Sequence, residues 1–226
     1  MDPQLLAGLS QGLILYIILA ASIALHEFGH AKVADLLGDH LPRSQGRVTL
    51  NPFAHLDPIG TGLIPLVMIF WPIVTGMSLP IGLIGWGRPV QISLAEPRTR
   101  VRDEILITLA GPGMNFLIAL VTAIIGGVYV RLHGGNAPDW AQQIIFINAL
   151  QIVFNLIPLP PLDGSRLMRH LVGMSEEMFM RMVTVTPFIL FIAVNMRWFQ
   201  EILLAATVRV AHIFYFVLYH LAGYNF

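Results

Sequence analysis

A histidine, a glutamate and a second histidine stand close together near the start of the chain, in the pattern H-E-x-x-H. His26 and His30 are four residues apart at the end of the apolar run 13–25. On a helix both imidazoles project from one face and can share one metal ion. Glu27 lies beside them, where a carboxylate can polarise a water on that metal. Two satisfied core histidines are the alternative, but a glutamate in an apolar helix is costly unless it has a role.

A third ligand is needed to complete the site. Two histidines and one carboxylate around zinc, with a fourth position open for water, make a hydrolytic centre. We select Asp163, because it follows the proline-rich stretch 158–161, which would hold a short carboxylate on a rigid support inside the membrane. A solvated Asp-Gly turn at this position stays open as the alternative. The residues thus predict one Zn²⁺ ion held by the two histidines and Asp163, with Glu27 as the base.

Composition places these residues in a membrane protein. The chain has 226 residues, of which 56% are hydrophobic and only 12% charged, and its mean hydropathy is +0.72. Soluble domains carry roughly 25% charged residues. The formal net charge is zero, which gives no case for nucleic-acid binding. The absence of cysteine excludes disulfides and cysteine-ligated metals.

The apolar segments predict an all-α polytopic membrane protein made of a single domain, residues 1–226. About five membrane-spanning helices are expected, at 5–37, 105–130, 140–157, 182–199 and 202–221. The uncharged stretch 59–86 contains three prolines and five glycines, so we expect it to be re-entrant or a broken hairpin. A glycine beside β-branched residues at 46–50 predicts a short membrane-associated β-hairpin after the first helix. The catalytic core is expected at about 5–169 and the C-terminal helices at about 182–222.

The position of the ligands constrains the path through the membrane. If Asp163 completes the site, the helices at 5–37 and 140–157 cross in the same direction, because each ends at the site. One crossing then separates them, which is the helix at 105–130, and 59–86 makes none. This path places ten of the thirteen Lys and Arg residues on one side: Lys32, Arg43, Arg47, Arg88, Arg98, Arg100, Arg102, Arg166, Arg169 and Arg181. The positive-inside rule assigns that side, and with it the site, to the cytoplasm.

Two stretches of the chain resemble the signatures of the site-2 proteases, a family of intramembrane zinc metalloproteases. They are H-E-F-G-H at 26–30 and N-L-I-P-L-P-P-L-D-G at 155–164, in this order and on separate apolar segments. A-G-P at 110–112 with Asn115, and G-R-V-T-L-N-P at 46–52, resemble the compact prokaryotic branch that lacks appended soluble modules. The resemblance therefore implies an enzyme, a zinc metalloendopeptidase of a prokaryotic cell membrane.

The resemblance also implies roles for single residues. His26, His30 and Asp163 would be the zinc ligands and Glu27 the catalytic base. Asn155 would be a polar group near the scissile carbonyl or the catalytic water, whereas the residues alone leave a helix–helix hydrogen bond open for it. The partners would be the lipid bilayer and a transmembrane protein substrate, cut in or near its membrane helix during regulated intramembrane proteolysis. A homo-oligomer stays open.

Two other functions compete with proteolysis. A non-proteolytic membrane metal-binding or transport protein would use the histidines and Asp163 as permeation ligands, but transporters commonly contain repeats, and this sequence has none. An inactive protease-derived scaffold is the second rival. The sequence argues against it only because all the candidate catalytic residues are present. The role of His55 is also open, between an extra metal ligand, a proton relay and a surface-loop histidine.

Overall fold

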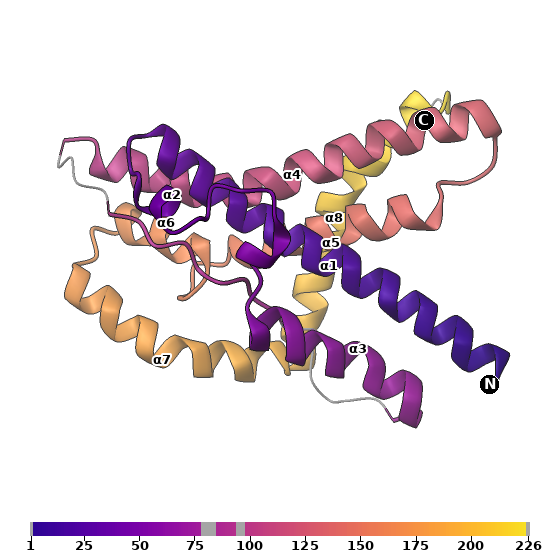
Figure 1. Cartoon of the computed structure of the whole chain (residues 1–226), viewed down its shortest axis with the longest axis horizontal. Coiled ribbons are helices and arrows are strands. Elements are labelled where there is room, and N and C mark those ends of the chain that lie inside the picture. The colour runs from indigo at the N-terminus through magenta and orange to yellow at the C-terminus, as the bar shows by residue number, and fades with distance from the viewer. Residues whose placement is uncertain (1, 78–84, 94–97, 225–226) are drawn as a thin grey trace.

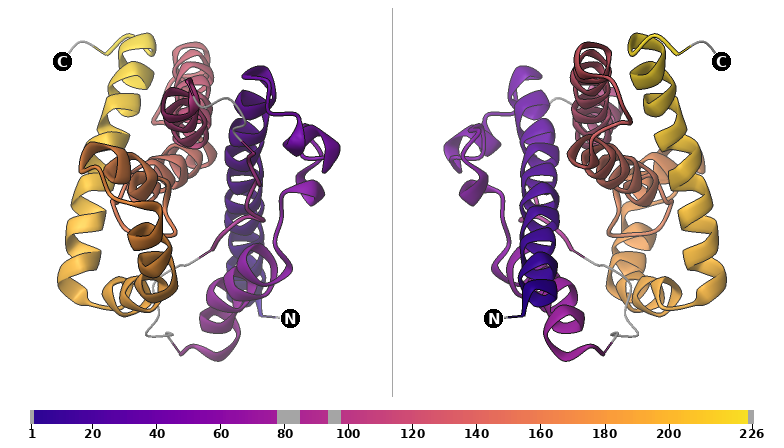
Figure 2. Two further views of the ribbon diagram at one scale, coloured as in Figure 1. Left: turned by 90° about the vertical axis from the view of Figure 1, so that its left-hand side faces the viewer. Right: turned by 90° about the vertical axis from the view of Figure 1, so that its right-hand side faces the viewer.

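The structure, a computed structural model, describes residues 2–77, 85–93 and 98–224, and helices dominate that part of the chain (Figure 1). In chain order the elements are α1 (Pro3–Leu36), α2 (Leu41–Ser44), η1 (Pro52–Ala54), η2 (Pro58–Leu63), α3 (Ile64–Thr75), α4 (Arg100–His133), α5 (Asp139–Asn155), α6 (Asp163–Leu171), α7 (Glu176–Val194) and α8 (Arg197–Leu221). The prediction of an all-α protein is confirmed. Figure 2 shows α1 and α3 on one side of the molecule and α7 with α8 on the opposite side.

Five of the described helices are long and apolar enough to cross a membrane. They are α1, the continuous stretch Pro58–Thr75, α4, α7 and α8. The chain is therefore a multi-pass membrane protein. This set differs from the expected one in two elements: it includes Pro58–Thr75, which was not expected to span, and it lacks α5, which was. α5 has only 17 residues, about 26 Å of helix, and it packs between α1, α4 and α8.

The first helix is fixed at both ends by local chemistry. The Asp2 side chain accepts a hydrogen bond from the N–H of Gln4, and Pro3 occupies the first helical position, where its missing N–H costs nothing. Gly38, with φ +93°, follows the last turn in the left-handed region that glycine adopts freely. α1 is thus a continuous 34-residue helix, and it carries the H-E-x-x-H pattern near its C-terminal end.

The chain between Leu56 and Gly87 ends next to the residue where it begins. Leu56 and Gly87 form an antiparallel bridge, and the N–H of Arg88 donates to the carbonyl of His55 at 2.7 Å. The residues between these points include α3, which continues through Pro72 and ends at Gly76. The two ends of this stretch are therefore bonded to each other, as a broken hairpin at 59–86 would require. Pro80 lies outside the described residues.

The β-hairpin predicted at 46–50 is wrong. Residues 48–50 form bends, and no strand is found there. The N–H of Arg47 donates to the carbonyl of Pro42 at 2.8 Å, and the carbonyl of Thr49 accepts from the imidazole of His55 at 2.8 Å. A turn and a side chain satisfy the backbone groups that a partner strand would otherwise need. The β-branched residues at 48 and 49 gave the strand signal, but propensity alone supplies no partner strand.

Helices α4, α5 and α8 form the largest apolar cluster. Its buried members include Ala119, Ala123, Ala141, Ala149 and Ala211, with Phe214 and Leu218 from α8. Small side chains let membrane helices approach closely, where van der Waals contact and interhelical hydrogen bonds hold them. This packing fixes α4 and α5 side by side, and the site is built between them and α1.

Candidate metal centre

His26 and His30 lie one turn apart on the buried face of α1. Their side chains belong to residues only 6% and 9% exposed, and their ring centroids are 4.7 Å apart at an interplanar angle of 84°. The two Nε2 atoms lie 3.1 Å from each other. The spacing predicted from the sequence is therefore realised, and both rings present a nitrogen to one point.

The other ring nitrogen of each histidine is held by α4. His26 Nδ1 lies 2.6 Å from Asn115 Oδ1, and His30 Nδ1 lies 2.7 Å from the carbonyl oxygen of Ile107. Both partners are acceptors, so each Nδ1 carries the proton and donates it. Each Nε2 is left with a lone pair, which is the tautomer that a metal ligand requires.

A glycine lets α4 approach this pair of rings. A Cβ placed on Gly111 would lie 2.3 Å from His30 Nε2 and 2.6 Å from His26 Nε2. A Cβ on Gly29 would lie 2.6 Å from the carbonyl oxygen of Ala110. Real side chains do not tolerate such contacts, so α1 and α4 meet here through their backbones. The A-G-P stretch is thus a point of close helix approach.

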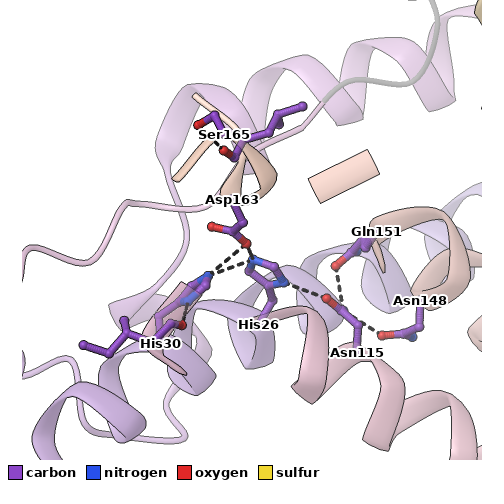
Figure 3. Close-up of polar contacts among 9 residues, drawn as sticks. His26, His30, Asn115, Asn148, Gln151, Asp163 and Ser165 are labelled. Carbon is purple, nitrogen blue, oxygen red and sulfur yellow. Dashed lines mark hydrogen bonds and ion pairs between the residues drawn. The ribbon is translucent and has the colours of Figure 1, made fainter. Parts of the chain in front are cut away.

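Asp163 reaches the same point from α6. Its Oδ2 lies 3.2 Å from His26 Nε2 and 3.3 Å from His30 Nε2 (Figure 3). The turn that delivers it is tight: a Cβ on Gly164 would lie 2.2 Å from the carbonyl oxygen of Leu156, and Ser165 Oγ donates to the carbonyl of Leu162. The structure therefore brings Asp163 together with the two histidines, as the sequence-based choice requires.

The three atoms fit a zinc ion. Among the described residues, His26, His30 and Asp163 form the one cluster able to hold a metal. Asp163 Oδ2 is buried without a well-aligned hydrogen bond, and it faces two nitrogen lone pairs, so three electron-rich atoms converge with no proton between them. Ligands of a tetrahedral zinc with bonds of about 2.0–2.1 Å lie about 3.3 Å apart, close to the separations seen here.

Glu27 and Asn155 lie beside this cluster without belonging to it. Both line a cavity of about 520 Å³ together with the three ligand residues. Glu27 packs against the segment 85–93, where a Cβ on Gly87 would lie 2.6 Å from Glu27 Cγ. Asn155 is the last residue of α5. These placements put both residues at the wall of the cavity that His26, His30 and Asp163 also line.

A chain of buried amides leads away from His26 (Figure 3). Asn115 Nδ2 donates to Asn148 Oδ1 and to Gln151 Oε1, each at 2.9 Å. Asn148 Nδ2 in turn donates to Ser22 Oγ at 3.0 Å. These contacts join α4, α5 and α1. Asn115 thus links three helices and also contacts His26 directly.

The position of α6 is set by an ion-pair cluster that the sequence analysis missed. Glu104, 5% exposed, lies 3.4 Å from Arg166 Nη1 and 3.0 Å from His170 Nε2. This joins α4 to the helix that begins at Asp163. The i, i+4 spacing of Arg166 and His170 places them on one helix face, but nothing in the sequence pairs that face with Glu104.

His55 is buried and is not part of the metal cluster. Its Nε2–H donates to Thr49, and burial lowers the pKa of its imidazole. The guanidinium of Arg47, 4% exposed, donates to the carbonyls of Ala54, Arg88 and Pro89. The surface-loop interpretation of His55 is therefore wrong on exposure. His55 helps to hold the loop 47–56, which is bonded to the segment 85–93 through the N–H of Arg88.

Comparison with known proteins gives relatives of one kind. The chain is 34% identical over 179 residues to "Putative zinc metalloprotease YwhC" of Bacillus subtilis, covering 76% of this chain and 75% of that protein. It is 32% identical over 146 residues to "Putative zinc metalloprotease Rip2" of Mycolicibacterium smegmatis, covering 63% of this chain and 51% of Rip2. The chain thus spans about half the length of Rip2. No protein-family model and no solved structure matches.

Proposed function

We propose, from the premise that the chain belongs to the zinc metalloprotease family that includes YwhC, that it is an intramembrane endopeptidase of the site-2 type. It hydrolyses peptide bonds in or near the transmembrane helices of other membrane proteins. One observation carries the proposal: His26, His30 and Asp163 converge within a bundle of membrane helices. A hydrolytic centre at that place meets substrates that are themselves embedded in the bilayer.

The three ligands and Glu27 divide the chemistry. Zinc held by His26, His30 and Asp163 would polarise the scissile carbonyl and acidify a water molecule. Glu27 takes the proton from the attacking water and gives it to the leaving amine. It can do so because it lies at the cavity wall beside the ligands and is not one of them. Asn155 lies on the same wall, and its amide donates to the carbonyl oxygen as charge develops there.

The cavity suits an unwound stretch of a membrane helix. Its wall is largely apolar, with contributions from Leu19, Ile23, Leu190 and Leu203. The segment 85–93, which is neither helix nor strand, forms one side. A substrate strand lying along such a backbone can pair with it by hydrogen bonds, which replace those lost when its own helix unwinds.

The site is proposed to lie towards the cytoplasmic side of a prokaryotic cell membrane, with the catalytic core at about 5–169. The basic residues counted above support this orientation. α5 runs in the same direction as α1, since Gln143 lies by Gln11 and Asn148 by Ser22. This parallel course is what a shared depth for the histidines and Asp163 requires.

The test uses the purified full-length chain and a panel of single-span membrane proteins, reconstituted together. Cut sites are mapped by mass spectrometry, and zinc is measured by elemental analysis. The wild type should cleave within or beside the membrane helix. Glu27→Gln should keep its zinc and lose at least about 100-fold in rate, whereas Asp163→Asn should lose zinc as well.

The same variants separate the rival functions. In a transport or metal-binding protein, Glu27→Gln would leave metal binding or transport unchanged. An inactive scaffold would cleave no substrate, either as the wild type or as a variant. Cleavage by Glu27→Gln at the wild-type rate would refute the mechanism. Cleavage confined to soluble loops would refute the intramembrane assignment.

A further inference from the structure

The side-chain amide of Asn115, next to His26, is held in one of its two orientations. Asn115 Nδ2 has two hydrogens and two acceptors, Asn148 Oδ1 and Gln151 Oε1. With both hydrogens engaged, the Asn115 oxygen has to face His26. Had the amide turned over, Nδ2 would face His26 Nδ1, and two hydrogen bonds would be lost in a place with no water to replace them. Asn115 and Asn148 are both completely buried.

This orientation decides which nitrogen of His26 holds the proton. Facing an oxygen, Nδ1 keeps its proton and donates it. Facing an NH₂ group, Nδ1 would have to be the acceptor, and the proton would move to Nε2. There it would point at Asp163 and His30 Nε2, which lie 3.2 and 3.1 Å away. A proton at that position occupies the space of the metal.

Apart from the hydrogen bond that it accepts from Asn115, the buried amide of Gln151 destabilises the fold. Its residue is 9% exposed, and its Nε2 is buried with no hydrogen-bond partner among the described residues. An unpaired buried amide destabilises a protein, because it has given up its hydrogen bonds to water without replacing them. A methionine of similar size would fill the same volume without that cost. The one hydrogen bond that Gln151 makes here is the one it accepts from Asn115.

We propose that Asn148 and Gln151 are positioning residues that lock the Asn115 amide and, through it, keep the His26 proton on Nδ1 so that Nε2 stays free for the metal ion. Both residues lie on α5, which leads directly towards Asp163 through the turn 156–162. One helix therefore precedes the carboxylate ligand and also sets the state of a histidine ligand on another helix. This inference rests on the proposed metal site but not on proteolysis.

Two acceptors hold the Asn115 amide, so single and double substitutions should differ in their effect on zinc affinity. Losing one acceptor leaves the other to hold Asn115, whereas losing both frees the amide to turn over. Single substitutions of Asn148 or Gln151 should therefore weaken zinc binding by less than about threefold. Asn115→Leu and the double variant Asn148→Leu/Gln151→Met should each weaken it by about 10–100-fold, the range for removing groups that orient metal ligands.

The experiment measures the zinc dissociation constant of the full-length protein by chelator competition at one fixed pH, and the absorption spectrum of the Co²⁺-substituted form. Thermal unfolding of the metal-free protein is followed in parallel. Gln151→Met should lower the unfolding temperature less than Asn115→Leu does, because it removes one unpaired amide while leaving one Asn115 hydrogen without its acceptor. Gln143→Leu, on α5 but outside the chain of amides, is the matched control and should leave zinc affinity unchanged.

Three results would overturn the inference. They are wild-type zinc affinity in the double variant, a double effect no larger than the product of the single effects, and an unchanged Co²⁺ spectrum in Asn115→Leu. If the double leucine–methionine variant does not fold, Asn148→Ala/Gln151→Met carries the same expectation. A wild type that binds zinc but cleaves nothing would end the protease proposal and leave this one standing.

Discussion

Two regions of the molecule are held together in different ways. Where α1, α4 and α5 cross, the buried side chains are polar and bonded to one another, as Ser22, Asn115 and Asn148 are. In the C-terminal arm, formed by α7 and the first half of α8 (residues 176–207), the picture is the reverse. α7 buries only Phe179, Thr186, Leu190 and Val194 of its 19 residues, and most of its other large apolar side chains are exposed.

The difference follows from the solvent. Lipid is as apolar as leucine, so an apolar helix face has little to gain by exchanging lipid for protein. A buried amide or imidazole has no such substitute and needs a partner in protein. Geometry is therefore specified where the polar groups lie. The arm supplies cavity wall through Leu190, Val194 and Thr207, but the hydrogen bonds found for the Nδ1 atoms of His26 and His30 among the described residues go to α4 and not to the arm.

The largest effect is expected from Gly111→Ala. Its new methyl group would overlap both imidazole nitrogens and push α4 away from α1, so zinc affinity should fall by about 10–100-fold. Gly113→Ala, two residues along the same helix, meets nothing within 4 Å and should bind zinc as the wild type does. Chelator competition on both variants makes the comparison. Equal affinities would mean that the polar crossing is not as tightly packed as described.

An intermediate effect is expected from the buried ion-pair cluster. Glu104→Gln removes the charge that joins α4 to Arg166 and His170 on α6, and should cost about 1–3 kcal/mol of stability. Its counterpart in the arm is Glu201→Gln, which breaks an exposed pair with Arg197 and should cost less than about 0.5 kcal/mol. Thermal unfolding of the two variants in one detergent measures both. A larger loss in the arm would reverse the comparison.

The smallest effect concerns a buried polar group outside both regions. Burial lowers the pKa of His55, so the folded state disfavours its protonated form. Its contribution to stability is complete above the ordinary imidazole pKa of about 6.5 and is lost as the pH falls below that value. His55→Gln should flatten the fall in unfolding temperature between pH 7.5 and 5.5 by a few degrees. The exposed His133→Gln should not, and an equally steep fall in His55→Gln would exclude this role.

Local patterns in the sequence were enough for much of the site. The four-residue spacing of His26 and His30 guarantees a shared helix face, because an α-helix repeats every 3.6 residues. The proline-rich approach and the glycine after Asp163 marked a rigid, non-helical support. Long apolar runs identified the membrane helices, although the strand expected at 46–50 showed that propensity without a partner is a weak guide.

What the sequence determined by itself was therefore the helical class and the choice of the proposed ligands and base, each of which depends on neighbours within a few residues. The tertiary structure alone decided which helix face meets which: that Asn115 reaches His26 across 89 residues of chain, that Gly111 lies against both rings, and that Glu104 holds α6. Such contacts depend on the relative rotation and depth of whole helices. No local periodicity carries that information, because any apolar face of a membrane helix can contact lipid at a similar free energy.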